Sequence, residues 1–414
     1  MGNLRKKIYN ISDKGGKRLG FDLPYFVENG FWVLLAQFVN LTASLVMSVV
    51  FARYLSKEIF GEYQLLLSFL GILAIISYSG LNTSIVRSVA KGFDYSYVKA
   101  VNFSFKKSLL AIPIFLALSF WYYYQENQEL SIVLIVAGLM FSFIYAHNKW
   151  AAYNKGKAKF ELVAKQQILQ NITLNVLLIF AAVFFSENLF AITGIYLVVN
   201  AGFNTFWHFQ TKKEITNKKV DDDCIPYGKY LTKMSLFSIF ISYFDKIIIG
   251  IIDVKILAIY AIALKLFDVI KQIIKSFYSI SFPKFAQKKI KIERYKILII
   301  MLIGVLFTVV LYFVSKPVII YFYTDKYAEV VDIFRKLIFV LPLIFVSPLF
   351  ANKARAQKDK QRIVLANIFA PVLAVILSII VFIITENIEY FVLVKVYILQ
   401  VAYFIVLVPV FKRN

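Results

Sequence analysis

Long apolar runs alternate with short polar or charged breaks along almost the entire chain. A helix that crosses a bilayer needs about 20 mostly apolar residues, and twelve runs fit that pattern or come close to it. They predict helices near residues 30–52, 62–84, 108–124, 131–148, 166–185, 190–210, 231–252, 257–281, 297–314, 332–352, 363–384 and 390–410. The third run is short, and the segment 316–327 is open to a re-entrant or interfacial conformation instead of a plain loop. The pattern predicts an all-α polytopic membrane protein with twelve transmembrane helices.

Composition supports this class and excludes others. Of the 414 residues, 60% are hydrophobic and only 17% are charged, and the mean hydropathy is +0.71. Soluble domains contain about 25% charged residues. A soluble globule of this size could not bury so much apolar side chain, so we exclude soluble enzymes, collagen-like chains, disordered chains and disulfide scaffolds. The single cysteine, Cys224, allows neither an internal disulfide nor a cysteine metal cluster.

The net charge is +23, and the distribution of the basic residues along the chain indicates the membrane topology. With the N-terminus in the cytoplasm, 35 of the 47 lysines and arginines fall in inner segments and only seven in outer ones. Every inner loop is then basic, as the positive-inside rule requires. We therefore expect both termini in the cytoplasm and no nucleic-acid partner, with contact to anionic membrane lipids as a secondary consequence of the charge.

The two halves of the chain resemble each other weakly. FGEY at residues 60–63 aligns with LAIY at 257–260, and SIVR at 84–87 aligns at the same offset of 197 with SFPK at 281–284. Six helices per half would give both halves one orientation, so we expect a parallel pseudo-two-fold repeat, with chance similarity as the alternative. The predicted organisation is a basic cytoplasmic N-terminus (1–29) that lacks signal-peptide features, an N-terminal six-helix lobe (30–210), a cytoplasmic linker (211–230) and a C-terminal six-helix lobe (231–414).

Three segments carry a resemblance to a known family. Residues 51–63, FARYLSKEIFGEY, resemble the "ARYLG…EFG.Y" signature of bacterial polysaccharide exporters, and residues 80–87, GLNTSIVR, resemble the stretch that follows it. Residues 242–250, SYFDKIIIG, resemble the "SYxDKxxIG" stretch of the family's seventh helix. The chain is thus similar over nearly its whole length to the O-antigen and capsule repeat-unit flippases of the multidrug/oligosaccharidyl-lipid/polysaccharide exporter superfamily. Ser56 departs from the family's usual glycine, in a turn that we expect to be exposed.

The resemblance implies a function and its partners. The family's cargo is an undecaprenyl-diphosphate-linked oligosaccharide, translocated from the cytoplasmic to the outer leaflet of the bacterial inner membrane by alternating access. Membrane lipids and, as further partners, a glycan polymerase or glycosyltransferases follow from the same resemblance. No cofactor is implied, apart from a coupling ion that could be a proton or a sodium ion.

A diphosphate must pass about 30 Å of hydrocarbon, in which an unpaired charge costs tens of kcal/mol by Born estimates. We therefore expect a hydrated cationic cavity, built from ionisable residues within the helices. The deeply placed ones are Lys246, Lys265, Lys271, Asp245 and Asp268. We expect the lysines, above all Lys246 and Lys265, to hold the diphosphate, and the aspartates to tune them or to carry a coupling cation. Buried ion pairs that only hold helices together are the alternative.

Two further lysines in the predicted helices, Lys275 and Lys395, lie nearer the inner and outer interface, where a long side chain can snorkel to water. His147 and His208 lie at predicted cytoplasmic helix ends, where an ordinary interfacial histidine is favoured over a proton-coupling role.

Polar side chains recur at helical spacing and predict cavity walls. The C-terminal lobe contributes Ser238, Ser242 and Gln272, and the N-terminal lobe contributes Gln37, Asn40, Ser44, Asn171 and Asn204. The amides suit sugar hydroxyls, and interhelical hydrogen bonding is the equal alternative. Arg53 and Arg87, at opposite ends of the first hairpin, are candidates for phosphate contact, with ordinary charged helix ends as the alternative.

Catalytic motifs are missing from the sequence. It contains no GxxxxGK[ST] P-loop, no HExxH and no plausible Cys/His nucleophile pair, so we expect neither an enzyme nor an ATP-driven pump. A cation-coupled multidrug antiporter of the same superfamily is the main competing function, but it would favour carboxylates over the five lysines and two aspartates found within the predicted helices. A membrane glycosyltransferase or polymerase would need a sizeable outer loop, and the predicted outer loops are short.

Overall fold

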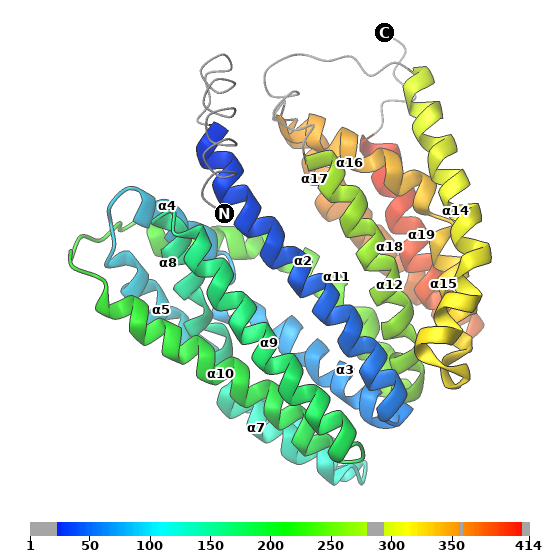
Figure 1. Ribbon diagram of the computed structural model, residues 1–414, viewed down its shortest axis with the longest axis horizontal. Helices are drawn as coiled ribbons and strands as arrows, with labels where there is room; N and C mark the ends of the chain where they lie inside the picture. The colour runs from blue at the N-terminus through cyan, green and yellow to red at the C-terminus, as the bar shows by residue number, and fades with distance from the viewer. Residues whose placement is uncertain (1–22, 280–293, 357–358, 408–414) are drawn as a thin grey trace, which may run out of the picture. The chain divides into compact units, whose positions relative to one another are not determined.

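The computed structural model describes residues 23–279, 294–356 and 359–407, and every regular element in these ranges is a helix (Figure 1). Up to residue 213 the elements are α2 (Leu23–Tyr54), α3 (Lys57–Leu73), η1 (Ala74–Ser77), α4 (Leu81–Ala90), α5 (Ser96–Ser108), α6 (Ala111–Tyr124), α7 (Gln128–Tyr145), η2 (His147–Lys149), α8 (Trp150–Gly156), α9 (Phe160–Phe184) and α10 (Leu189–Lys213). They are followed by α11 (Cys224–Ile252), α12 (Val254–Ser279), α14 (Arg294–Tyr323), η3 (Asp325–Tyr327), α15 (Glu329–Ile338), α16 (Leu341–Ala356), α17 (Lys360–Val364), the π-helical η4 (Leu365–Phe369), α18 (Ala370–Thr385) and α19 (Ile388–Leu407).

The helices confirm the predicted fold class. Ten segments of the described chain are long and apolar enough to cross a membrane, and the bent pair α15–α16, with an angle of 47°, brings the number to eleven. Helix α12 is also long enough, at 26 residues, but Lys265, Asp268 and Lys271 lower its apolar character. Counted with α12, the segments coincide with the twelve predicted helices.

Two local expectations need correction. The third predicted helix begins earlier than its apolar run, because the amphipathic α5 precedes α6 and carries three lysines that hide it from a hydropathy reading. Residues 316–327 form neither a re-entrant segment nor a plain loop. Helix α14 continues through Pro317 to Tyr323, and only the short η3 follows it. An internal proline removes one backbone hydrogen bond without ending this strongly apolar helix.

The chain divides into two compact units, which we describe separately. Unit 1 comprises residues 1–47, 74–185 and 190–233, and unit 2 comprises residues 48–73, 186–189 and 234–414, within the limits of the described residues. Helix α2 contributes to both. The predicted N-terminal segment 1–29 lies mostly outside the described residues, as does the 281–284 part of the repeat. The predicted lobe boundaries and the repeat stay predictions.

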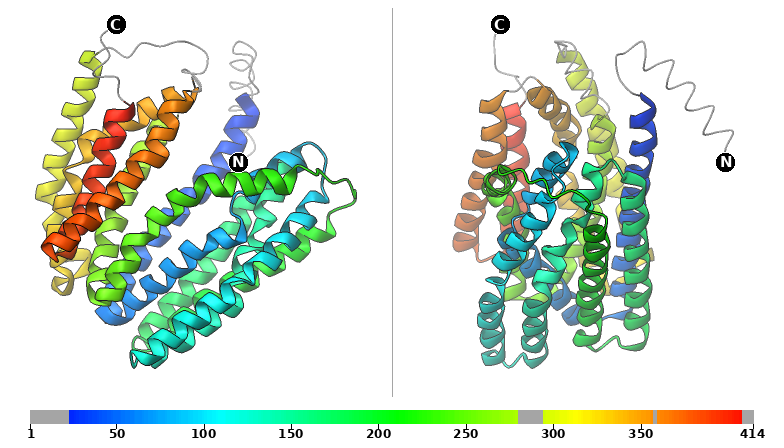
Figure 2. Two further views of the ribbon diagram at one scale, coloured as in Figure 1. Left: turned by 180° about the vertical axis from the view of Figure 1, so that it is seen from behind. Right: turned by 90° about the vertical axis from the view of Figure 1, so that its left-hand side faces the viewer.

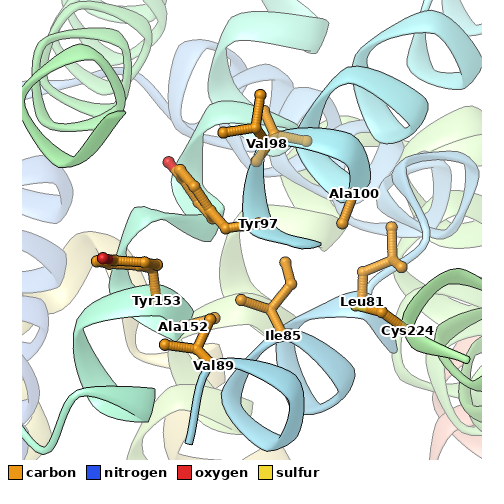
Figure 3. Packing of buried hydrophobic residues seen from close by; sticks show 10 residues of the cluster. Leu81, Ile85, Val89, Tyr97, Val98, Ala100, Ala152, Tyr153 and Cys224 are labelled. Atoms are coloured by element: carbon orange, nitrogen blue, oxygen red, sulfur yellow. The ribbon is translucent and has the colours of Figure 1, made fainter. Parts of the chain in front are cut away.

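Residues of α4, α5 and α8 form a hydrophobic core in unit 1. Leu81, Ile85 and Val89 recur on one face of α4 and lie around Tyr97 and Tyr153 (Figure 3). The first residue of α11, Cys224, belongs to the same buried cluster. The chain entering α11 is therefore packed against α4.

Close packing also explains a glycine in unit 1. A Cβ at Gly80, just before α4, would lie 2.5 Å from the carbonyl oxygen of Gly228 and 2.5 Å from the backbone nitrogen of Thr232. The backbone nitrogen of Gly80 donates a hydrogen bond of 3.0 Å to the Thr232 hydroxyl. Only glycine fits this approach between α4 and α11 without a shift.

Unit 2 is built on pairs of packed helices. Helix α3 lies along α12, α14 packs on α16, and α18 packs on α19 (Figure 2). At the α3–α12 contact, a Cβ at Gly61 would lie 1.8 Å from the carbonyl oxygen of Val254. Helix α14 leaves a broad apolar face exposed, with Leu302 and Leu306 each 66% exposed. Such a face is what a helix presents to lipid.

Candidate functional site

Unit 2 contains a polar cavity of about 530 Å³. Its walls come from helices α11, α12, α16, α18 and α19 and from the π-helical turn η4. The polar lining residues include Ser238, Ser242, Lys271, Lys275, Asn352 and Gln400. Ser238 and Ser242 recur one turn apart on α11, and Lys271 and Lys275 do so on α12, so each pair shares one helix face. Ser238 and Ser242 of the predicted α11 stripe thus line the cavity, whereas the predicted wall residue Gln272 of α12 is not among its lining residues.

The cavity has positive character. Two lysines line it, and no lining residue among those described is an aspartate or glutamate. The ammonium of Lys271 pairs at 2.6 Å with the Asp268 carboxylate one turn earlier, and that aspartate side chain is 52% exposed. An exposed pair of this kind is weak, so an anion entering the cavity could compete for Lys271.

A buried ion pair lies in the same unit. The ammonium of Lys395 on α19 is 2.7 Å from the Asp245 carboxylate on α11, with exposed side-chain fractions of 8% and 3%. Lys395 also donates to the carbonyl oxygen of Ile241 at 2.6 Å, and the Tyr260 hydroxyl of α12 donates to Asp245 at 2.5 Å. The carboxylate thereby joins α11, α12 and α19.

This pair corrects the sequence-based expectation for Lys395. A lysine near a predicted interface was expected to snorkel outward, but this side chain points into unit 2, where a carboxylate and a carbonyl satisfy it. The alternative in which Asp245 forms a buried ion pair is therefore found, although its partner is Lys395 and not the expected Lys246, Lys265 or Lys271. Sequence depth alone does not tell which way a side chain points, so Lys395 could not be identified from it.

Lys246 and Lys265 are not among the residues that line this cavity. The Lys246 ammonium lies 5.8 Å from the centre of the Tyr243 ring, in the range of a cation–π contact. Lys265 is half-buried and close enough to Lys246 for the two charges to interact. Gln272 is half-buried on α12. The roles of Lys246 and Lys265 toward a diphosphate stay predictions.

Unit 1 contains a second polar cavity, of about 540 Å³. Three of the predicted wall residues line it: Asn40 on α2, Asn171 on α9 and Asn204 on α10. Gln37 and Ser44 are half-buried elsewhere on α2. Sequence analysis missed several other lining amides, among them Asn82, Asn148 and Gln170, because they fall at helix ends or off the chosen stripe.

The two candidate arginines both interact with protein groups. In unit 2, the Arg53 guanidinium donates to the carbonyl oxygens of Phe322 at 2.9 Å and Tyr321 at 2.6 Å. These oxygens belong to the last turn of α14, where carbonyl groups have no partner within the helix. In unit 1, Arg87 pairs with Asp223 at 3.2 Å and lies 4.9 Å from the Tyr227 ring centre. The helix-end alternative accounts for these contacts, and phosphate binding by either arginine stays a prediction.

Near Arg53, the Lys326 ammonium donates to the carbonyl oxygen of Leu55. Burial is the main cause that lowers the pKa of Lys326. These contacts join the short loop after α14 to the α2–α3 turn within unit 2.

The two histidines of the chain stack on each other in unit 1. Their ring centres are 4.4 Å apart, with an angle of 9° between the planes. Nδ1 of His208 lies 2.7 Å from the Tyr97 hydroxyl, and Nδ1 of His147 lies 3.0 Å from the Thr205 hydroxyl. Both rings are buried within unit 1, and both residues lie near helix ends, as expected. Double protonation would place two like charges in contact, so the stack favours neutral rings.

Comparison with known proteins places these features in a family. The family model described as "Polysaccharide biosynthesis protein" matches residues 26–289. No protein with a curated description matches the chain significantly.

Solved structures share the fold at low sequence identity. The lipid II flippase MurJ, in an inward closed conformation, has a TM-score of 0.69 at 15% identity, covering 91% of this chain and 86% of its own. An inward-facing multidrug resistance MATE family transporter of the MOP superfamily has a TM-score of 0.65 at 13% identity, covering 88% and 92%. A MOP superfamily transporter from Pyrococcus furiosus has a TM-score of 0.56 at 14% identity, covering 93% and 94%.

Proposed function

The chain belongs to the polysaccharide biosynthesis protein family, and on that premise we propose that it moves a lipid-linked glycan across a membrane. The proposed cargo is an undecaprenyl-diphosphate-linked oligosaccharide repeat unit, of the O-antigen or capsule type. The proposed direction is from the cytoplasmic to the outer leaflet of a bacterial inner membrane, by alternating access. Glycosyltransferases that build the cargo and a polymerase that consumes it are the proposed functional partners.

The observation that supports this proposal is the positive charge of the residues that line the unit 2 cavity. Two lysines and no described carboxylate line about 530 Å³ of polar space. A diphosphate that leaves water needs cationic and hydrogen-bonding partners, because desolvation of the free anion is prohibitive. Lys275, Asn352 and Tyr403 lie near helix ends that the charge pattern assigns to the cytoplasm. The cavity would thus receive cargo on the side where it is made.

The contacts of Asp245 and Asp268 favour a role in tuning lysines over a role in carrying a coupling cation. Each carboxylate is paired with a lysine ammonium, at 2.7 Å and 2.6 Å respectively. A cation would have to displace these ammonium groups before it could bind. We therefore propose that both aspartates tune and position lysines, and that a coupling proton or sodium ion, if the transport cycle uses one, binds at other groups.

A cation-coupled multidrug antiporter is the competing function, since the fold is shared with a MATE family transporter. An organic cation would be repelled by Lys271 and Lys275, whereas an anion would be attracted. The two functions therefore predict opposite effects of removing these charges. Loss of the lysines should impair export of an anionic lipid and should not impair export of a cationic drug.

The test uses a strain that lacks the gene and makes a surface glycan through it. Complementation with K271A/K275A should lower surface glycan at least tenfold at unchanged protein abundance in the membrane. The charge-retaining K271R/K275R should restore most of it, and the control K212A/K213A, at exposed positions of α10, should behave as the parent chain. Normal glycan with K271A/K275A would contradict the proposal. A deletion strain with normal glycan but increased drug sensitivity would support the antiporter.

A further inference from the structure

The polar cavity of unit 1 differs from that of unit 2 in its chemistry. Helices α9 and α10 provide five amide side chains to its lining, from Gln167, Gln170, Asn171, Asn200 and Asn204. Asn40, Asn82 and Asn148 add three more from α2, α4 and η2. Amide groups both donate and accept hydrogen bonds. They predominate among the polar groups that face this space.

The charge of the cavity excludes strongly ionic ligands. Lys155 is the one charged residue among the described lining residues, and it is exposed. The described lining contains no carboxylate that would pair with a cation. One exposed lysine also offers a diphosphate fewer charge-assisted hydrogen bonds than the two lysines of the unit 2 cavity do. The chemistry fits an uncharged ligand rich in hydrogen-bonding groups.

Part of the amide set is held in place by its neighbours. The Gln170 amide donates to the Asn200 carbonyl oxygen at 3.1 Å, and the Trp150 indole donates to the Asn204 carbonyl oxygen at 3.1 Å. Asn204 in turn donates to the carbonyl oxygen of Ile144 at 3.1 Å. These bonds join helices and fix the orientation of the cavity wall. Interhelical hydrogen bonding explains this part fully.

The Asn171 amide likewise donates to the Asn40 side-chain oxygen, which joins α9 to α2. The remaining polar side chains have no such explanation. The side chains of Asn82, Thr83, Asn148 and Gln167 line the cavity but make no hydrogen bond to another described residue. The side-chain oxygen of Asn148 is buried and unsatisfied within the described structure. Buried polar atoms usually have a partner, and one without it needs an explanation. The half-buried Gln167 and the exposed Asn82 and Thr83 line the same space. Its volume of about 540 Å³ is that of a small-molecule site.

We propose that the unit 1 cavity binds uncharged sugar residues of the glycan cargo. This inference rests on the proposed function and extends it, because it assigns the saccharide and the diphosphate to cavities of different chemistry. Sugar hydroxyls would take the free hydrogen-bonding positions of Asn148, Gln167, Asn82 and Thr83. The cavity would then set which repeat units are accepted, while the lysines of unit 2 would recognise the part that all cargos share.

The test measures binding to the full-length protein in lipid nanodiscs. The two probes are undecaprenyl diphosphate and the same lipid carrying one N-acetylglucosamine. We expect the sugar-bearing probe to bind more tightly to the parent chain. In N148L/Q167M, which keeps side-chain size but removes the polar groups, its affinity should fall about tenfold, as expected for two lost hydrogen bonds. Affinity for the bare lipid should not change.

Controls separate the site from the wider function. N175L makes the same kind of change on α9, at a residue outside the cavity lining, and should keep the preference for the sugar-bearing probe. N82L/T83V alters exposed positions at the start of α4 and provides a second test if N148L/Q167M does not fold. Equal binding of both probes by the parent chain, or unchanged binding by both cavity variants, would overturn the sugar site alone. Failure to bind either lipid would overturn the proposed function as well.

Discussion

Lys395 and Asp245 show how one residue pair can hold several helices together. Both side chains are more than nine-tenths buried, and the carboxylate also accepts from Tyr260. Removing one partner of a buried pair leaves an uncompensated charge, which costs about 3–5 kcal/mol. Replacing both partners by neutral groups of similar size is far less costly. The pair therefore allows a double-mutant test of its own structural role.

K395M is expected to lower the stability of the purified protein by several kcal/mol, measured by thermal unfolding in detergent micelles. D245N/K395M should recover most of that loss, because neither charge is then left alone. The control K316M, at an exposed lysine of α14, should unfold as the parent chain does. A K395M protein as stable as the parent would show that Asp245 does not depend on this ammonium.

Arg87 presents the opposite case at the residue scale. Its ion pair with Asp223 is exposed, at side-chain fractions of 42% and 59%, and such pairs contribute less than about 1 kcal/mol. Arg87→Gln should therefore leave thermal unfolding nearly unchanged. Because the helix-end contacts account for this arginine, export of surface glycan should also stay within twofold of the parent. A loss of more than fivefold at unchanged stability would instead identify Arg87 as a contact of the phosphate.

At the scale of helices, the contact of α3 with α12 depends on a glycine. A Cβ at Gly61 would lie 1.8 Å from the backbone oxygen of Val254, and backbone cannot move aside cheaply at a packed helix crossing. G61A should lower the unfolding temperature and protein abundance in the membrane. Gly194, inside α10, has no neighbour within 4 Å of an added Cβ. G194A should be neutral or stabilise by about 0.5–1 kcal/mol, since alanine favours helix. Equal effects of the two substitutions would contradict the packing argument.

This contact also explains a motif that sequence comparison could only match. FGEY at residues 60–63 is part of the resemblance to polysaccharide exporters, and its glycine is needed for helix packing. The apolar runs predicted twelve helices because period and length are local properties of a chain. They missed α5, whose lysines reduce its hydropathy, and they ended α14 early, because the helix continues past Lys316 and Pro317.

The sites were predicted unevenly for a physical reason. Helical spacing placed Ser238 and Ser242 of α11 on one face, and Lys271 of α12 faces the same cavity. Spacing within one helix cannot reveal which residues of other helices complete a site. Asn352 and Gln400 lie about 110 to 160 positions further along the chain than Ser238 and Ser242, and they reach the same cavity only through tertiary packing. The partner of Asp245 was missed for the same reason, since Lys395 lies 150 positions away.

At the scale of the whole molecule, the question is whether α12 crosses the membrane. It carries more charge than the ten apolar segments, yet the number of crossings decides the side of everything after it. If α12 crosses, the loop after α9 and the loop after α18 lie on the same, outer side. If α12 does not cross, the loop after α18 lies inside. The basic loops between the helices that follow α12 would then lie outside, against the positive-inside rule.

Single cysteines distinguish the two topologies. The native Cys224 is buried, 2% exposed, and should resist a membrane-impermeant maleimide, so C224S provides the background. In that background E187C and E386C, both at exposed loop positions, should react in intact cells. K218C, in the segment between α10 and α11, should react only after the membrane that holds the protein is permeabilised. Labelling of E187C without labelling of E386C would show that α12 does not cross. In that case Lys275, near the end of α12, would not lie at the inner surface. The proposal that the lysine cavity opens toward the cytoplasm would then be contradicted.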